Sequence, residues 1–267
     1  MPTRIHVVGA APRTGTTLMF ELLVASYGID GSAEHEMSIF DRPSGPYDVF
    51  CSKLPGDILS VGPLLRFDEH LWVINMIRDP RDVVVSRHAR EPTKYWVHLG
   101  VWKRRSGAAR RLVNHPRFVT VRYEDLVTDP ARVQGEIEDR LPFLRRKADF
   151  KDFHKNAAPS DRAVEALGGV RPIEATSVGG WRHHKARLAA QLAAHGPIDQ
   201  DLVDYGYEPD DSWLRELDGI APDNGATFFS ERESLMSRLR RGARRQLLTL
   251  RYLSAMKWAP SQPSGGA

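Results

Sequence analysis

The stretch RIHVVGAAPRTGTTLMFELL, from Arg4 to Leu23, decides the fold. Its β-branched run predicts a strand that ends at Gly9, and its apolar residues from Leu18 onward predict a helix. The loop between them consists of small and hydroxyl-bearing residues around Arg13. Backbone N–H groups at a helix N-terminus favour an anion, and a guanidinium adds a planar set of donors. The stretch therefore predicts a strand–loop–helix unit that binds a phosphate-like group.

This loop differs from the phosphate loop of nucleoside-triphosphate enzymes, which has the pattern G-x-x-x-x-G-K-[ST]. Thr16 follows Gly15 where that pattern has lysine, and the segment from Gly9 to Gly15 is one residue too long. The loop is therefore expected to hold phosphate-like groups without the lysine and magnesium ion of a kinase.

A second strand–helix unit follows downstream. Leu71 to Ile77 is a nearly continuous apolar run, which is typical of a parallel strand buried on both faces. The sequence RDPRDVVVS comes next, from Arg78 to Ser86. Its first aspartate suits a helix N-cap, and its proline suits the first helical turn. Because Arg78 ends the strand and Ser86 lies about two helical turns further on, the two can bracket one anion.

The two units together resemble those of the sulfotransferases that use 3′-phosphoadenosine 5′-phosphosulfate (PAPS). Arg13 to Leu18 fits the family's first motif, [KR]-x-G-T-[TS] after a strand. Arg78 to Ser86 fits the second, R-[DN]-P-x-D-x-x-x-S, at every fixed position, and the match covers about the first half of the chain. The resemblance implies that Arg78 and Ser86 bind the 3′-phosphate of PAPS. It also implies that the first loop holds the 5′-phosphosulfate, through Arg13, Thr14, Gly15, Thr16 and Thr17.

Two later segments resemble nucleotide-contacting segments of the same family. Tyr123 opens a Y-E-D-L segment, in which the resemblance implies a nucleotide contact for the tyrosine. Trp181 belongs to a late G-x-W-[KR] segment, which in the family closes on the 3′-phosphate and adenine. The R-K-G that usually precedes it is missing at 175–177, where Ala-Thr-Ser stands. Either Arg171 or Arg182 is then expected to supply the extra charge, or the second motif supplies all of it.

The general base is expected among Glu34, His35 and Glu36, just after the first helix, where α/β folds place their chemistry. Transfer of a sulfonyl group to a hydroxyl needs removal of its proton, which a glutamate or histidine can accept. Some bacterial members of the family carry a glutamate base in this region, so Glu36 is favoured. The alternative is a solvated charged loop without a catalytic role.

Lys53 ends a predicted strand at 48–53, where a cation can neutralise charge on a leaving group. Many family members carry K-[TS]-H-L-P here, whereas this chain reads CSKLP at 51–55. Alignment on the L-P puts Lys53 on the histidine position and a cysteine on the lysine position. Alignment on a shorter K-x-P form keeps Lys53 as the cation, and we prefer it because a phosphate leaving group profits from a cation. The missing histidine shifts the role of base to Glu36, and a plain surface lysine is the alternative for Lys53.

Composition restricts the class of protein. The 267 residues are 41% hydrophobic and 27% charged, as in globular proteins. The single cysteine, Cys51, excludes an internal disulfide and a cysteine metal cluster, and the adjacent His183 and His184 diverge on a helix, so no metal is expected. The net charge of +4 does not indicate nucleic-acid binding. Neither a signal peptide nor an apolar run of about 20 residues is evident, so a cytoplasmic bacterial protein is expected.

Strands that alternate with helices predict a three-layer α/β, P-loop-like fold with a mostly parallel central sheet flanked by helices. The strand ends at Gly9, Lys53 and Arg78 are expected at one edge of this sheet, where open α/β sheets bind ligands. Residues 91–111 are expected to be helical, and the polar, glycine-containing residues 144–172 are expected to form a mobile loop. The resemblance implies that this loop is a lid over nucleotide and acceptor.

Residues 221–267 are expected to form a helical extension with a flexible tail, distinct from the domain at 1–220. From Glu231 to Trp258, leucines alternate with arginines, which indicates a basic amphipathic helix. Three interpretations of this helix stay open: packing on its own domain, a homodimer contact, or a contact with an anionic membrane surface or an anionic acceptor.

The expected reaction is in-line transfer of a sulfonyl group from PAPS to a hydroxyl or amine. Arg13 and Lys53 are expected to offset charge, and Glu36 is expected to take the acceptor's proton. Small molecules, carbohydrates, lipids and peptides all stay open as acceptors. Two other classes are weighed: a P-loop-type nucleotide kinase or phosphotransferase, disfavoured by the missing lysine, and a non-catalytic nucleotide-binding protein on the same scaffold, favoured by the displaced lysine–histidine motif.

Overall fold

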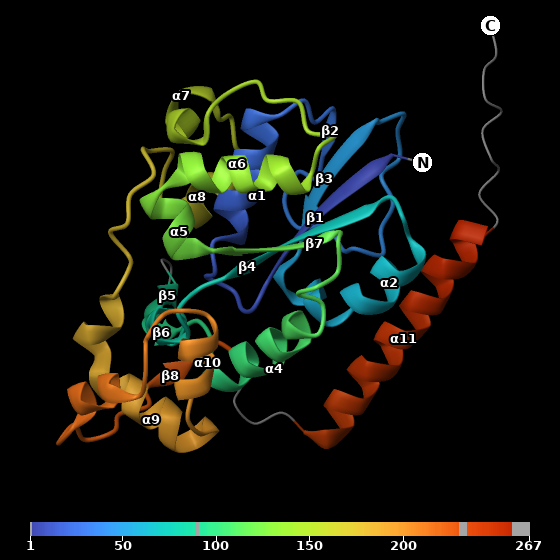
Figure 1. The fold of residues 1–267 in the computed structure, drawn as a ribbon. Helices are drawn as coiled ribbons and strands as arrows, with labels where there is room; N and C mark the ends of the chain where they lie inside the picture. Colours follow the sequence, from blue (N-terminus) through green and yellow to red (C-terminus); the bar gives the residue numbers. More distant parts are fainter. Residues whose placement is uncertain (1, 89–90, 230–233, 258–267) are drawn as a thin grey trace, which may run out of the picture.

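The central sheet of the computed structural model, which describes residues 2–88, 91–229 and 234–257, has the strand order β2-β3-β1-β4-β7 (Figure 1). Its strand pairs are parallel, so the carboxyl ends of the strands meet at one edge. The predicted α/β fold with a mostly parallel sheet is therefore confirmed. The strands are β1 (Thr3–Gly9), β2 (Gly31–Ser32), β3 (Val49–Lys53), β4 (Leu71–Ile77) and β7 (Phe118–Arg122).

Strand β4 shows why its sequence is almost entirely apolar. Successive side chains of a strand point to opposite faces of the sheet. Trp72, Ile74 and Met76 pack with the helices of one face, whereas Leu71 and Val73 pack with the helices of the other. Because helices cover both faces of β4, all its residues are buried except the half-buried Trp72. The predicted buried strand is therefore confirmed.

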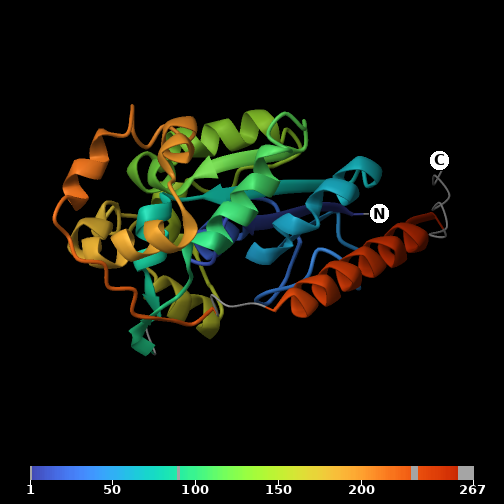
Figure 2. The same cartoon turned by 90° about the horizontal axis from the view of Figure 1, so that it is seen from below.

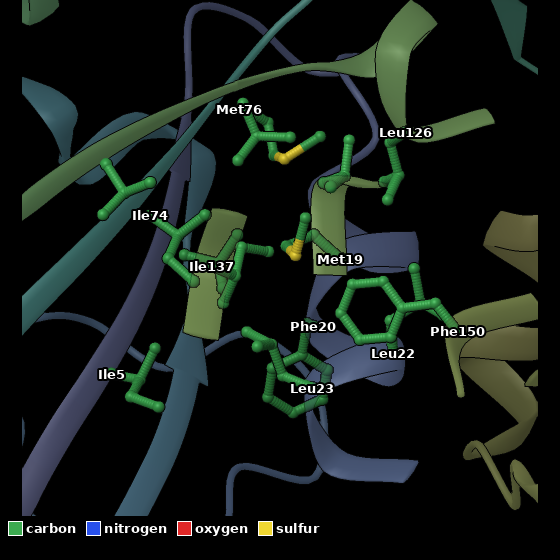
Figure 3. Packing of buried hydrophobic residues seen from close by; sticks show 14 of the residues in the cluster. Ile5, Met19, Phe20, Leu22, Leu23, Ile74, Met76, Leu126, Ile137 and Phe150 are labelled. Atoms are coloured by element: carbon green, nitrogen blue, oxygen red, sulfur yellow. The ribbon is translucent and has the colours of Figure 1, made fainter. Parts of the chain in front are cut away.

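One face of the sheet is covered by a layer of helices around α1. Figure 3 shows Met19 and Leu23 of α1 packing towards Ile5 and Ile74 of the sheet, with Phe150 closing the cluster from outside. These side chains are buried almost completely, and they hold the start of α1 against the end of β1. The helices of this layer are α1 (Thr16–Ser26), α5 (Tyr123–Thr128), α6 (Pro130–Arg140) and α7 (Phe153–Asn156).

The opposite face is covered by three helices. Leu64 and Leu65 of the first of them pack against Val73, and Tyr252 from the last one joins the same cluster. Figure 2 shows the last helix running along the outside of this layer. The helices are α2 (Val61–Phe67), α4 (Leu99–Arg110) and α11 (Leu235–Lys257).

Further elements lie beyond the carboxyl edge of the sheet. A small second sheet has the order β5-β6-β8, with β5 at Arg87–His88, β6 at Glu91–Tyr95 and β8 at Ala226–Thr227. The remaining α-helices are α3 (Pro80–Val85), α8 (Asp161–Leu167), α9 (Lys185–His195) and α10 (Asp199–Asp204). Turns of 3-10 helix lie at Pro55–Leu59, Phe150–Asp152, Gly180–His184 and Ser212–Leu217.

The predicted helix at 91–111 is wrong in its first part. Residues Glu91–Tyr95 form strand β6, and the helix begins only at Leu99. Lys94 and Tyr95 pair with Ala226 and Thr227, which lie far away in the sequence. The propensity of a short segment cannot reveal such a partner, because the pairing depends on how distant parts of the chain pack.

The prediction that residues 144–172 form a loop is also wrong. It contains α7, α8 and a 3-10 turn. Phe150 and Phe153 are buried in the core beside α1, and the Ser160 hydroxyl caps α8 by accepting from the backbone N–H of Ala163 at 3.4 Å. These anchors place the segment against the carboxyl edge of the sheet.

The C-terminal helix α11 packs on the domain through its second half. The Tyr252 hydroxyl donates a hydrogen bond to Asp68 and accepts one from Arg4 of β1. Strand β8 also contacts the domain, so both parts of the extension touch residues before 220; the division at 220 stays a prediction. Within the described residues, no helix combines the length and the apolar character needed to cross a membrane.

Candidate functional site

The loop between β1 and α1 has the backbone conformation of a tight anion cradle. Gly15, the residue before α1, has φ +88°, and Arg13 has φ +71°, which is uncommon for a residue with a side chain. A Cβ added to Gly15 would lie 2.6 Å from Cδ2 of Tyr123, so only glycine fits. In the described part of the chain no side chain caps α1, which leaves its first N–H groups available to a ligand.

The two sequence motifs meet directly at this loop. The Nε of Arg13 donates to Oγ of Ser86 at 3.1 Å, and Nη1 of Arg78 donates to the carbonyl oxygen of Arg13 at 3.1 Å. The pKa of Arg13 is lowered mainly because the surrounding protein partly desolvates its guanidinium, and also because Arg78 is nearby. Two cationic side chains held together in this way favour an anion between them.

Arg78 also joins a third segment to the site. Its Nη2 donates to the carbonyl oxygen of Ser177 at 2.6 Å, and its guanidinium lies 4.6 Å from the centre of the Tyr123 ring. The Tyr123 hydroxyl is 2.8 Å from Oγ of Ser177. The late segment around residue 177 is therefore bound to the second motif, and the buried Nε of Arg78 has no hydrogen-bond partner within the described residues.

Asp82 explains how this late segment is held. Its carboxylate accepts hydrogen bonds from the backbone N–H of Gly179 at 2.8 Å and from that of Trp181 at 2.9 Å. Burial raises the pKa of Asp82, while Arg78 opposes the shift. From the sequence, Asp82 is considered only as a structural partner of Arg78; its fixed position in the second motif was the signal for a further role.

These residues surround a cavity of about 380 Å³ at the carboxyl edge of the sheet. Seven of the residues predicted to bind the donor line it, namely Arg13, Gly15, Thr16, Thr17, Arg78, Ser86 and Tyr123. The opposite wall comes from the segment around α8, which the sequence predicted only as a loop; its lining residues include Leu167, Arg171, Ile173 and Ser177. The cavity therefore lies between the two motifs and the segment expected to act as a lid.

Two side chains predicted to bind the donor do not line this cavity. The Thr14 hydroxyl is fully buried and donates to the carbonyl oxygen of Ala11 at 2.8 Å, so it shapes the loop from inside. The Trp181 indole is 1% exposed and lies edge-on to Trp213 in the core, while Arg81 stacks 4.6 Å from its centre. Both residues therefore position the site through packing.

Of the two arginines left open by the missing R-K-G, the structure brings Arg171 to the cavity. Arg182 instead lies 3.2 Å from a carboxylate oxygen of Glu216 and stacks on the Trp181 ring. Arg171 is exposed at the cavity mouth, which is where a cation could still reach a bound phosphate.

Two of the three predicted catalytic side chains, Lys53 and Glu36, form an ion pair. The Nζ of Lys53 lies 3.6 Å from Oε1 of Glu36. Lys53 is 1% exposed at the end of β3, and its pKa is lowered because it is buried, although Glu36 and Glu21 oppose the shift. His35 is half-buried beside this pair, and burial together with Lys53 lowers its pKa. A neutral imidazole therefore stays available at 35 as an alternative base.

Glu36 does not line the first cavity but a second one, which lies on the other side of the phosphate loop. Pro12 lines this second cavity, whereas the next residue, Arg13, lines the first. The phosphate loop therefore separates the two cavities. Within the described residues, no group of three or more His, Cys, Asp or Glu side chains could hold a metal ion.

The class of protein is defined by a parallel α/β sheet with an uncapped helix after β1: it is a P-loop-like α/β protein. Arginines from two motifs meet at one cavity, which is the candidate anion site. Residues 34–142 match the profile of the Sulfotransferase family. The resemblance to sulfotransferases is thereby confirmed for this segment, which contains the second motif, while the first motif precedes it.

No curated protein matches the chain in sequence. Among solved structures, it is similar to the sulfotransferase domain of the Synechococcus PCC 7002 olefin synthase, at 14% identity and a TM-score of 0.44, over 97% of this chain and 96% of that one. It is also similar to the sulfotransferase domain from the curacin biosynthetic pathway, at 12% identity and a TM-score of 0.42, over 98% and 99%. A third is retinol dehydratase in complex with retinol and PAP, at 15% identity and a TM-score of 0.33, over 94% and 81%.

Proposed function

We propose that this protein transfers a sulfonyl group from PAPS to a hydroxyl or amine of a small-molecule, carbohydrate or lipid acceptor. The observation that carries the proposal is the meeting of Arg13, Arg78 and Ser86 at one cavity beside the uncapped start of α1. This arrangement offers two neighbouring positions for anions, as a nucleotide with phosphate groups at both 5′ and 3′ ends requires.

Each end of the donor has a matching set of groups. The N–H groups at the start of α1 and the guanidinium of Arg13 suit the 5′-phosphosulfate, because helix N-termini and arginine forks both bind oxyanions. Arg78 and Ser86 suit the 3′-phosphate, which ATP lacks. The ring of Tyr123, which lies against Arg78 at the same cavity, supports a contact with the nucleoside.

In the transfer step, Glu36 would take the proton of the acceptor hydroxyl while the oxygen attacks sulfur. The bond between sulfur and the bridging oxygen of the 5′-phosphate breaks, and adenosine 3′,5′-bisphosphate leaves. Lys53 would offset the negative charge that develops on that oxygen. Because Lys53 is buried, its charge is screened little by solvent.

The proposal is tested by calorimetric titration with adenosine 3′,5′-bisphosphate and with AMP, which lacks the 3′-phosphate. We expect the bisphosphate to bind at least about 10-fold more tightly, since hydrogen bonds to a charged group contribute about 1.5–3 kcal/mol. Arg78→Met should remove this preference, and Arg66→Met, an exposed arginine on α2, should leave it intact.

Equal affinity for the two nucleotides would contradict the proposal. Magnesium-dependent turnover of ATP would favour the phosphotransferase class instead. Tight binding of the bisphosphate without transfer from PAPS to any acceptor would favour the non-catalytic nucleotide-binding protein.

A further inference from the structure

The second cavity has a volume of about 460 Å³ and lies on the side of the sheet covered by α4 and α11. It touches the proposed reaction centre at two points, Pro12 of the phosphate loop and Glu36. Because Arg13 lines the donor cavity, an acceptor in the second cavity would approach the donor from across the loop. An in-line displacement requires the acceptor to reach the sulfur from the side opposite the leaving phosphate, and the second cavity gives the acceptor a place separate from the donor cavity.

The charge of this cavity is strongly positive. Four arginines line it, one from α4 and three from α11, against two acidic residues. One of the acids, Asp57, is already engaged, since its Oδ2 accepts from the backbone N–H of Ile39 at 2.6 Å and lies 3.3 Å from Nε2 of His6. The arginines are Arg105, Arg241, Arg244 and Arg245.

Arg105 has hydrogen-bond donors that lack acceptors in the described part of the chain. Its Nε and Nη1 are buried without a hydrogen-bond partner within the described residues. Burial and the neighbouring Arg104 lower the pKa of Arg105 to about 10, and burial and Arg104 also lower the pKa of Arg245. A buried guanidinium with unmatched donors is costly, and an anion bound there would supply both the missing acceptors and the missing charge.

Most of the rest of the cavity wall is apolar or aromatic. Trp96 lies edge-on to Phe228 with ring centres 4.9 Å apart and also contacts Phe229, which itself lines the cavity. Phe40 and Leu248 also line the cavity, as do two serines. A ligand that fills the cavity would therefore have an apolar body as well as an anionic group.

We propose that this cavity is the acceptor site and that the acceptor is an anionic hydroxy compound with an apolar body, held through a carboxylate or phosphate by Arg105 and Arg245. The inference rests on the proposed function, because it assigns the sulfonyl acceptor of the same reaction. The acceptor hydroxyl lies towards Glu36, loses its proton there and forms the new bond to sulfur. The product is a sulfate ester that keeps its original anionic group.

The test uses three probes of equal chain length: 10-hydroxydecanoate, 10-hydroxydecyl phosphate and the neutral decane-1,10-diol. Each is titrated by calorimetry into the full-length protein without donor. We expect both anions to bind at least about 10-fold more tightly than the diol, since each makes charge-assisted hydrogen bonds that the diol cannot make. Whichever anion binds more tightly identifies the natural acceptor as a carboxylate or a phosphate.

Single arginine variants test whether the anionic probes bind in this cavity. Arg105→Met should weaken both anions about 10-fold or more, whereas Arg240→Met, an exposed arginine on the same helix as Arg245, should leave them unchanged. If Arg105→Met lowers the melting temperature strongly, Arg245→Gln at the cavity rim provides the same comparison. Arg78→Met should not affect the anionic probes, because that residue lines the donor cavity.

Three results would overturn the inference: equal binding of the diol and the anions, unchanged anion binding in Arg105→Met and Arg245→Gln, or displacement of the anions by adenosine 3′,5′-bisphosphate. The failure of the proposed function is a different result. In that case the bisphosphate itself would not bind, whatever the hydroxy acids do.

Discussion

The Nζ of Lys53 and Oε1 of Glu36 lie 3.6 Å apart, which joins the end of β3 to the loop that follows α1. Lys53 is nearly inaccessible to solvent, whereas the Glu36 side chain is 43% exposed and lines the second cavity. A buried ammonium needs a counter-charge, and the Glu36 carboxylate supplies one. The carboxylate reaches the second cavity, while the ammonium lies buried at the end of β3.

The first prediction concerns the identity of the base. Glu36→Gln should lower kcat by about 10²–10⁴-fold, because an amide cannot accept the acceptor's proton, while the affinity for adenosine 3′,5′-bisphosphate stays unchanged. Transfer of labelled sulfonate to an accepted hydroxy compound measures this. Glu69→Gln, an exposed glutamate remote in the sequence, is the control. A larger loss in Glu34→Gln or His35→Asn would move the role of base to that residue.

Lys53 gives a second prediction about the leaving group. Lys53→Met should lower kcat by about 10²–10³-fold, which is the usual loss when one charge-stabilising donor is removed. The methionine fills a similar buried volume, so the melting temperature should change little. Single-turnover kinetics with saturating PAPS separate this effect from donor binding. A variant with the full rate of transfer would show that Lys53 has only a structural role.

Asp82 should couple the late segment to the donor site. Asp82→Asn replaces a carboxylate that accepts two backbone N–H groups by an amide whose nitrogen opposes one of them. We expect a loss of about 1–3 kcal/mol in the free energy of unfolding. Affinity for the bisphosphate should fall as well, because Ser177, held by Arg78, belongs to the same segment.

Denaturant unfolding and calorimetry measure the two effects of Asp82→Asn. Asp139→Asn, on the exposed side of α6, serves as the matched control and should change neither. Intact donor affinity in a destabilised Asp82→Asn protein would disconnect the late segment from donor binding.

His6 predicts a specific dependence of stability on pH. It is fully buried in β1, its Nδ1 lies 2.8 Å from Oγ of Ser52, and burial lowers its pKa below the model-peptide value of 6.5. Above pH 6.5 both folded and unfolded states carry a neutral imidazole. Below it the unfolded state takes up a proton that the folded state refuses, so stability falls as pH falls, by up to about 1.4 kcal/mol per pH unit.

The measurement is the free energy of unfolding between pH 7.5 and pH 5.5 for the protein and for His6→Gln. The other histidines titrate equally in both, so the difference in slope isolates His6. We expect a shallower slope in His6→Gln, and identical slopes would show that His6 is protonated in the folded protein as well.

The outer face of α11 predicts a membrane contact. Met236, Leu239, Leu247 and Leu250 are each at least 57% exposed along this face, and exposed arginines flank them. A helix with such a face binds anionic bilayers through apolar burial and charge. We expect co-sedimentation with phosphatidylglycerol vesicles that decreases with added salt, and none with phosphatidylcholine vesicles.

The double variant Leu247→Glu with Leu250→Glu should abolish this binding. Val113→Glu replaces an equally exposed apolar residue outside α11 and should not. A dimer in analytical ultracentrifugation that the double variant converts to a monomer would assign this face to a homodimer contact instead.

Local signals in the sequence were sufficient for several elements. The apolar run of β4 and the cap formed by Asp79, which accepts from the N–H of Arg81 at 2.8 Å, are both as predicted. Such features depend on residues a few positions apart, and the physics of caps and strands acts at that range. Strand β6 was missed because one of its two partners, β8, is distant in the sequence and the other, β5, is only two residues long.

By itself, the sequence determined the class of fold, the two motifs predicted to bind anions and the chemistry available to Arg13, Arg78 and Ser86. Only the tertiary structure decided that Thr14 and Trp181 face inward, and that the arginines of α11 come to lie beside Glu36. The physical reason is the distance along the chain over which the deciding contacts act. Caps, turns and strand periodicity are settled by neighbours along the chain, whereas the lining of a cavity is settled by which distant surfaces bury one another when the chain folds.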